Sequence, residues 1–437
     1  MIGAGVINIP KIPELRKRLL FTLFFLAIYR LGVAIPTPGV DREAFLEFFN
    51  QAKGTLLGMF DMFSGGALER FSVFTLGIMP YITASIIMQL MTAVFPYLEK
   101  LQKEGEYGKR KMTQYTRYLT VFISFLQGFM ISYGLESAQT LAGMPIVLQG
   151  GIGFRLMTAL TLTAGTSFIM WLAEQITERG VGNGSSLIIY AGIVVRLPNA
   201  IVTTFKQIFM GETSFFALIF LLGLMLVVIG VIIYFERAHR KIPVQYARRV
   251  VGRKVYGGVQ THLPLKLNTA GVIPPIFASS LLVFPMTIAN FIQKPWAEAV
   301  AKYLTSTSFA YNALYVVMII FFCYFYTAVI FNPVDISENL RKYGGYVPGI
   351  RPGKNTADYI DSILGRITLP GALYISTICV LPNFLIDWFN VPFYFGGTSL
   401  LIVVGVAMDT VQQIEMHLLS RNYDGFMKGG ALKGRGA

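Results

Sequence analysis

The residues best suited to catalysis or metal binding are few in this chain of 437 residues. His239, His262 and His417 do not form the His-Glu-x-x-His spacing that places two zinc ligands and a general base on one helix face. No Gly-x-Ser-x-Gly turn presents a nucleophilic serine. Cys323 and Cys379 lie in apolar runs without metal-ligand spacing, so packing is their expected role. We therefore expect no enzymatic catalysis, no metal and no other cofactor.

Residues 349–355 come nearest to a phosphate-binding loop. A P-loop needs two glycines at a set spacing, followed by Lys and a Ser or Thr whose hydroxyl binds Mg²⁺. This stretch lacks the first glycine at that spacing and has Asn355 in place of the hydroxyl residue. We expect that the chain does not hydrolyse nucleotides, and that any directional work draws its energy from a partner.

Charged residues inside apolar runs are the usual markers of transport sites and proton relays. This chain has few of them. Arg30 lies two thirds of the way along the first run, Glu174 and Glu415 lie near run ends, and Asp409 lies deeper in the last run. The pattern favours helix-end and packing roles for these four. The other polar residues in the runs are mostly uncharged, which fits a pathway that does not hold its cargo.

Composition places the chain in a membrane, because 54% of its residues are hydrophobic, 14% are charged, and the mean hydropathy is +0.58. Ten apolar runs have the length of a membrane crossing. They are residues 19–35, 77–95, 118–134, 154–171, 187–205, 215–235, 270–292, 310–331, 368–386 and 399–418. The run at 187–205 contains Arg196 and Pro198, so a kink or an early helix end is expected there.

The basic residues predict the orientation. If the ten runs cross in turn, 28 of the 37 Lys and Arg residues fall on the side that holds both termini, and six fall on the other side. By the positive-inside rule both termini are cytoplasmic. The first apolar run has a basic flank and no small-residue cleavage site after it, so we read it as the first crossing.

One apolar segment, residues 56–68, is too short to cross. As a helix it would reach about 20 Å, whereas a bilayer core is roughly 30 Å thick. Counting it as a crossing would also move every later loop to the other side and destroy the charge bias. Two readings remain open: a re-entrant stopper hinged at Ser64-Gly65-Gly66, and an amphipathic helix on the outer surface.

The loop at residues 236–267 is long and basic. Aliphatic and aromatic residues alternate with cations and reach a Gly257-Gly258 turn, which predicts a protruding strand or hairpin. Such a surface attracts anionic lipid headgroups, ribosomal RNA or an acidic protein face. The alternative is that the cations only set the topology. The basic residues concerned are Arg240, Lys241, Arg248, Arg249, Arg253 and Lys254.

A second loop, residues 332–367, contains a compact turn. Residues 343–353 hold four glycines and two prolines, which impose tight turns with Arg351 near the tip. A cation on a rigid turn suits a contact point, although a solvated connection is the alternative.

Five segments of the chain carry a family resemblance. They are MFSGGALERFSVFTLGIMPYITASIIMQL, EQITERGVGNGSSLIIYAGIV, THLPLKLNTAGVIPPIFASSLL, YVPGIRPGKNT and PFYFGGTSLLIVVGVAMDT. These segments closely resemble the bacterial SecY family, whose members form the central subunit of the Sec protein-conducting channel (translocon). The match runs in order from about residue 13 to the C-terminus.

The resemblance implies an all-α polytopic membrane protein. Ten transmembrane helices would form two pseudo-symmetric halves of five, residues 1–210 and 211–437, around an hourglass pore. The re-entrant helix, residues 57–71, would be the plug of the outer funnel. The plug residues carried over are Phe60, Met62, Phe63, Ser64, Gly65, Gly66 and Leu68.

The same resemblance implies a pore ring and a lateral gate. Stiff aliphatic side chains at the waist would exclude ions by dewetting without gripping any particular peptide. The ring residues are Ile78, Ile82, Ile189, Ile276 and Ile402, and the gate residues are Thr83, Gln89 and Asn268.

The implied function is translocation of secretory polypeptides across the cytoplasmic (inner) membrane of a bacterium, with lateral release of transmembrane segments. The implied partners are the membrane subunits SecE and SecG, the ATPase SecA, the ribosome with its RNA, the unfolded polypeptide substrate and anionic lipids. Arg351 matches the arginine on which SecA-driven export depends in this family.

Two other classes are compatible with ten helices. A secondary transporter needs a specific site at the membrane midplane, usually built with ions or charges, and no such cluster is evident. An intramembrane protease or other membrane enzyme needs a catalytic pair, which we do not find. Saturable uptake of a metabolite would favour the transporter, whereas bound ribosomes or SecA would favour the channel.

Overall fold

The computed structural model describes residues 13–52, 61, 64–137, 145–210, 215–246, 249–251, 254–256, 260–291, 308–389 and 397–429. By internal packing the chain divides into two compact units, which are described separately below. The first unit comprises Met1–Ile201 together with Val406–Ala437, and the second comprises Val202–Gly405. The predicted division into halves at residue 210 remains a prediction.

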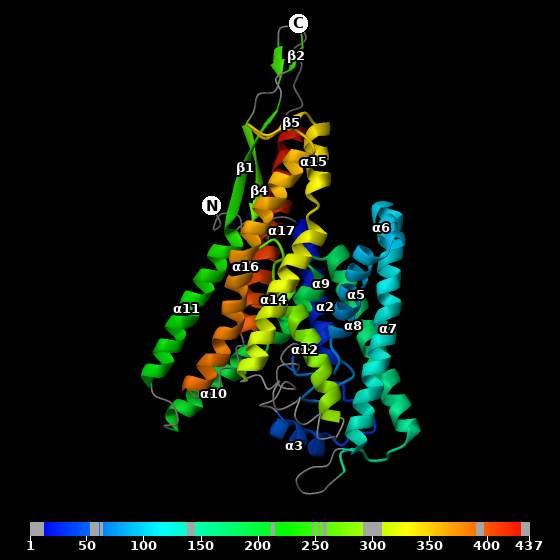
Figure 1. Ribbon diagram of the computed structural model, residues 1–437. Coiled ribbons are helices and arrows are strands. Elements are labelled where there is room, and N and C mark those ends of the chain that lie inside the picture. The colour runs from blue at the N-terminus through cyan, green and yellow to red at the C-terminus, as the bar shows by residue number, and fades with distance from the viewer. Residues whose placement is uncertain are drawn as a thin grey trace. The chain divides into compact units, whose positions relative to one another are not determined.

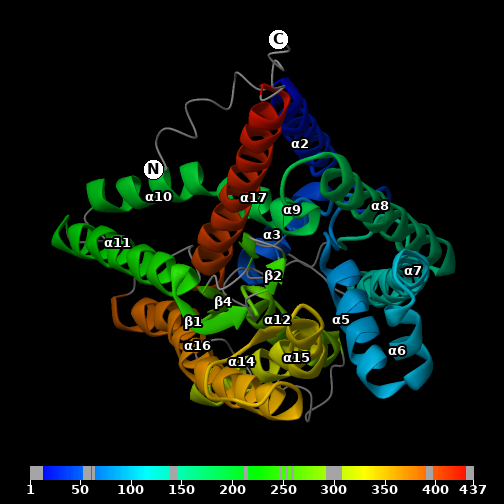
Figure 2. The same cartoon turned by 90° about the horizontal axis from the view of Figure 1, so that it is seen from above.

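Over its described residues, all the named elements of the first unit are helices, joined by turns such as residues 64–78. Its longest helices, α7 and α8, pack along each other, and Figure 2 shows α7 end-on beside α5, α6 and α8. The elements are α2 (Pro13–Gly32), α3 (Arg42–Ala52), α5 (Met79–Val94), α6 (Pro96–Lys103), α7 (Glu106–Ser137), α8 (Ile152–Arg179), α9 (Gly184–Val194), the start of α10 (Leu197–Phe209) and the later part of α17 (Gly397–Gly429).

Two ion pairs join α7 to α8. Arg117 donates two hydrogen bonds to the Glu174 carboxylate, at 2.9 and 2.8 Å. Arg155 donates one to Glu136 Oε2 at 2.6 Å. These four charged side chains of apolar helices are therefore paired, which lowers the cost of placing them in a membrane segment. Glu174 thus has the packing role that the sequence favours.

The second unit combines helices with short strands. The helix α16 contacts α11, α12, α14 and α15. The elements are α11 (Phe215–Arg237), β1 (His239–Tyr246), β2 (Arg249–Val251), β3 (Lys254–Tyr256), β4 (Gln260–Lys266), α12 (Ile273–Phe291), α14 (Phe309–Ile330), α15 (Pro333–Lys342), β5 (Gly345–Tyr346), α16 (Lys354–Phe389) and the start of α17. Cys323 and Cys379 are buried in α14 and α16, in keeping with packing roles.

The predicted hairpin is confirmed. β1 pairs antiparallel with β4, with Ile242 opposite Leu263 and Val244 opposite Thr261, and the pair extends away from α11 (Figure 1). β2 and β3 form a second antiparallel pair between them. The Gly257-Gly258 turn lies outside the described residues.

The apolar runs coincide with helices over the described residues, with one division. The run at 187–205 is split at residues 195–196 between α9 and α10, as Arg196 and Pro198 led us to expect. An α9 of 11 residues is about 16 Å long, which is roughly half a bilayer core.

By length and composition, five described helices can cross a membrane. A sixth is added if the bent pair α5 and α6 counts as one span. Large apolar side chains lie exposed on α2, α7 and α11, including Phe24, Phe122 and Leu226, where lipid would cover them.

Candidate functional site

The segment between α3 and α5 is held in the first unit by backbone turns. Residues 64–78 form turns rather than a helix, and α5 begins at Met79. Gly65 and Gly66 have φ of +66° and +87°. A Cβ on Gly65 would come within 2.8 Å of the Gly192 Cα on α9. This close approach requires glycine, both for the left-handed backbone and for the space.

Two side chains of α2 bind the carbonyls of this turn. The buried Tyr29 hydroxyl donates to the Ser64 carbonyl at 3.0 Å, and Arg30 Nη1 donates to the Gly65 carbonyl at 2.7 Å. Arg30, a lone cation in the first apolar run, is therefore a packing partner of the turn.

An ionic cluster fastens the same segment to the break between α9 and α10. Asp61 is fully buried, and its carboxylate is paired with Arg196. The same guanidinium nitrogen lies 3.3 Å from Glu69 Oε2. Asp61 Oδ1 also accepts a hydrogen bond from the Glu69 backbone N–H at 2.8 Å. Asp61, Glu69 and Arg196 are referred to below as the anchor triad.

Sequence reasoning did not single out Asp61. The available signal was one acidic residue, Asp61, in the apolar segment 56–68 and one basic residue, Arg196, in the apolar run 187–205. Isolated opposite charges in membrane segments tend to pair, because each is costly alone. Nothing in the local pattern says which acid pairs with which base.

Beyond the turn, the segment enters an apolar cluster. Leu68, Phe71 and Leu76 are buried with Phe45 and other side chains of the first unit, and the Phe45 and Phe71 rings lie 5.0 Å apart. The backbone is also tied, since the Thr37 N–H donates to the Phe71 carbonyl at 2.9 Å. Hydrogen bonds and ion pairs thus hold the first part of the segment, and apolar packing holds the second part.

In the second unit, the two basic loops form one surface, which we call the loop platform. β5, from residues 343–353, pairs antiparallel with β1, and the Tyr346 hydroxyl donates to Gln245 Oε1 at 3.2 Å. Ile242 and Leu265 of the hairpin pack in one cluster with Val347, Ile360 and Leu364. The sequence suggested two separate contact regions, and the structure joins them.

Exposed cations lie on the loop platform. Arg240 and Lys241 are exposed on β1, and Arg351 is exposed on its turn. The turn is braced from within, because the Thr356 hydroxyl donates to the Arg351 carbonyl at 2.9 Å and the Ser337 hydroxyl to the Gly353 carbonyl at 2.6 Å. Arg249 and Lys254 lie in β2 and β3, while Arg248 and Arg253 lie outside the described residues.

Comparison with known proteins places this geometry in context. The family model SecY matches residues 72–411. The chain is also 46% identical over 419 residues to the protein translocase subunit SecY of Aquifex aeolicus, which covers 96% of this chain and 98% of that protein.

The chain belongs to the SecY family.

Two solved structures agree with this membership at the level of the fold. The first is a SecY channel structure, described as showing that the plug domain of the SecY protein stabilises the closed state of the translocation channel and maintains a membrane seal. Its TM-score is 0.66 at 17% identity, and the match covers 97% of this chain and 98% of that chain. The other is Sec61 in the canine ribosome-channel complex from the endoplasmic reticulum, with a TM-score of 0.61 at 15% identity, covering 97% and 98%. The fold is the ten-span SecY architecture predicted from the sequence, and the protein is a multi-pass membrane protein.

The residues predicted to form a plug are partly described. Ser64, Gly65, Gly66 and Leu68 lie in the fastened segment, whereas Phe60, Met62 and Phe63 lie outside the described residues. Their role as a plug remains a prediction.

The predicted ring residues lie in both units, and each unit is described by itself. Ile78 caps α5 and Ile82 follows one turn later, with Ile189 on α9 of the same unit. Ile276 lies on α12 and Ile402 on α17 in the second unit. All are buried except Ile82, which is half-buried. Their assembly into one ring remains a prediction.

Two of the predicted gate residues, Thr83 and Asn268, make local side-chain hydrogen bonds. Thr83 donates to the Met79 carbonyl at 3.0 Å, and Gln89 is half-buried on α5. Asn268 is buried in the second unit, where its amide donates to Glu236 Oε1 at 2.6 Å and to the Gly271 carbonyl at 3.1 Å. Contact across a gate remains a prediction for all three.

Proposed function

We propose that this chain is the central subunit of a channel that passes unfolded polypeptides across the bacterial cytoplasmic membrane and releases apolar segments sideways into lipid. One observation supports this most directly. A non-spanning segment in a membrane protein is fastened by a few polar contacts that water could replace, while its other side packs on apolar residues. Such a segment suits a stopper that leaves and returns.

An unfolded secretory polypeptide carries charged residues and therefore needs an aqueous path through the bilayer. A charged residue at the bilayer centre costs about 2.5 kcal/mol or more, so an unfolded secretory chain cannot enter hydrocarbon unaided. An aqueous funnel removes this cost. Leu and Ile gain a few tenths of a kcal/mol each in lipid, so an apolar segment leaves through a side opening once one is offered.

The five ring isoleucines would form the seal at the waist. Uncharged branched side chains make a constriction that dewets and resists ions, yet they offer no hydrogen bond that would hold a passing peptide. At the gate, Thr83, Gln89 and Asn268 would latch two helices through contacts worth roughly 0.6 kcal/mol each, which are weak enough to open.

The loop platform would be the docking surface for the partners that bring the substrate. Its exposed cations suit ribosomal RNA, the acidic surface of an ATPase such as SecA, and anionic lipid headgroups. SecE and SecG would be the membrane subunits. The energy would come from SecA or from synthesis on the ribosome, with no catalysis by this chain, and both termini would be cytoplasmic.

The experiment is ion conductance of the resting channel in planar bilayers. Ile82→Gly and Ile276→Gly should each raise conductance, because each removes part of the apolar seal. The matched controls are Ile169→Gly and Ile319→Gly, which delete fully buried side chains of α8 and α14. Equal conductance for ring and control variants would remove these positions from the seal and refute the channel as proposed.

A further inference from the structure

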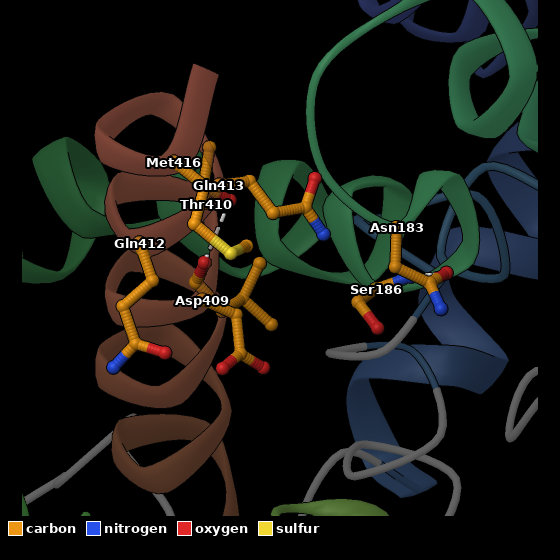
Figure 3. A pocket seen from close by; sticks show the side chains of 8 residues that line it. Asn183, Ser186, Asp409, Thr410, Gln412, Gln413 and Met416 are labelled. Atoms are coloured by element: carbon orange, nitrogen blue, oxygen red, sulfur yellow. Dashed lines mark hydrogen bonds between the residues drawn. The ribbon is translucent and has the colours of Figure 1, made fainter. Parts of the chain in front are cut away.

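A second site lies in the first unit, away from the anchor triad. It is a pocket of about 290 Å³ between the start of α9 and the later part of α17, and it is lined chiefly by Asn183, Ser186, Asp409, Gln412, Gln413 and Met416. Figure 3 shows Asn183 and Ser186 on one wall and the α17 side chains on the other. This volume suits one side chain of a larger molecule better than a whole small-molecule ligand.

The walls of the pocket are held in place by hydrogen bonds. Asn183 Oδ1 caps α9 by accepting from the Ser185 N–H at 3.1 Å and the Ser186 N–H at 3.5 Å. Across the pocket, Gln413 Oε1 accepts from the Gly182 N–H at 2.8 Å, which ties α17 to the turn before α9. The site is therefore formed before any ligand arrives.

The lining has a definite chemistry. Asp409 is the only charged residue among those that line the pocket, and its neighbours are amides, hydroxyls and a flexible methionine. A carboxylate suits an ammonium or guanidinium group, and the Met416 thioether suits the methylene stem beneath it. Among the described residues no group of three or more His, Cys, Asp or Glu could hold a metal ion, so a metal site is not supported.

The surrounding charge makes a cation-binding pocket useful. The chain carries a net charge of +14, which disfavours the approach of lysine and arginine side chains of a polypeptide. A local carboxylate offsets this repulsion at one point. We infer that the pocket between α9 and α17 binds the cationic side chain of a lysine or arginine in the translocating polypeptide. This inference rests on the proposed function and adds a substrate preference to it.

The test uses the intact channel complex in membrane vesicles and two secretory substrates. One substrate has two lysines before its apolar segment, the other has glutamines at those positions, and each carries a photoreactive leucine beside them. We expect residues 406–416 to crosslink up to about five times more of the lysine substrate, which is the upper end for a solvent-accessible ion pair. Asp409→Asn should abolish this preference and Asp409→Glu should restore it. Glu415→Gln, on the same helix but outside the lining, should keep it.

The failures are distinguishable. If Asp409→Asn keeps the preference for the lysine substrate, the Asp409 carboxylate does not bind the lysine side chain and the inference is wrong. If both substrates are transported but neither crosslinks to residues 406–416, the pocket lies off the path, which also overturns it. If the unchanged chain transports neither substrate, the proposed function itself is refuted.

Discussion

The anchor triad gives the sharpest prediction about the plug segment. Arg196→Gln would leave the Asp61 carboxylate fully buried without its counterion. Removing one partner of a buried ion pair costs about 3–5 kcal/mol. The lower end applies here, because Arg196 is 25% exposed and Asp61 keeps the hydrogen bond from the Glu69 N–H. At 1.4 kcal/mol per factor of ten, ~3 kcal/mol raises the ratio of released to seated segment about a hundredfold.

The assay is modification of a cysteine placed at Ala67, which is fully buried in the seated segment. A water-soluble maleimide reaches this position only when the segment leaves, so the labelling rate reports the released fraction. The native Cys323 and Cys379 are buried and contribute little background. We expect Arg196→Gln to raise the labelling rate by up to about a hundredfold, and resting ion conductance to rise with it.

A matched control separates release from general loosening. Arg155→Gln breaks the Arg155–Glu136 pair between α7 and α8, which has a similar exposed fraction of 28% on the arginine. It should leave Ala67→Cys protected. Equal labelling in Arg196→Gln and the unchanged chain would refute the claim that the triad holds the segment, and rapid labelling in both arginine variants would show that the unit as a whole has loosened.

Two further predictions concern backbone fit and docking. Gly65→Ala should release the same segment and raise Ala67→Cys labelling, because its Cβ would meet Gly192 Cα at 2.8 Å in addition to the strain at φ +66°. Gly105→Ala, with φ +71° and open space around it, carries only the strain and should leave labelling unchanged; the idea of close packing fails if the two behave alike. Arg351→Glu should reduce ATP-driven export at least tenfold while the chain still assembles in the membrane, because it reverses the charge on a braced, exposed turn. Arg341→Glu, exposed on the neighbouring α15, is the control, and normal export by Arg351→Glu would exclude it from the docking contact.

Much of the fold could be predicted because its signals are local. Apolar runs of spanning length predict helices, and the bias of 28 basic residues to one side predicts the orientation. Alternation of basic and aliphatic residues predicted the hairpin now seen as β1 and β4. The helix break near residue 196 followed from a charge and a proline within an apolar run.

Partner choice could not be predicted in this way. Asp61 and Arg196 are separated by 135 positions, and Gln245 and Tyr346 by 101. The hydrogen bond from the Asn268 amide to Glu236 was not predicted either, and the gate role of Asn268 remains a prediction. Each of these pairings depends on which polar groups the tertiary fold brings together, and neither the 3.6-residue nor the two-residue periodicity of the sequence records that.

The sequence by itself thus determined that this is a multi-pass membrane protein of the SecY family with a short non-spanning segment and basic loops, because hydropathy, charge bias and family motifs are properties of consecutive residues. Only the tertiary structure decided that Arg196 holds the segment through Asp61 and Glu69, that β5 joins the two basic loops, and that Asp409 faces a preformed pocket. Those arrangements arise from the need to satisfy buried charges and hydrogen bonds between distant parts of the chain.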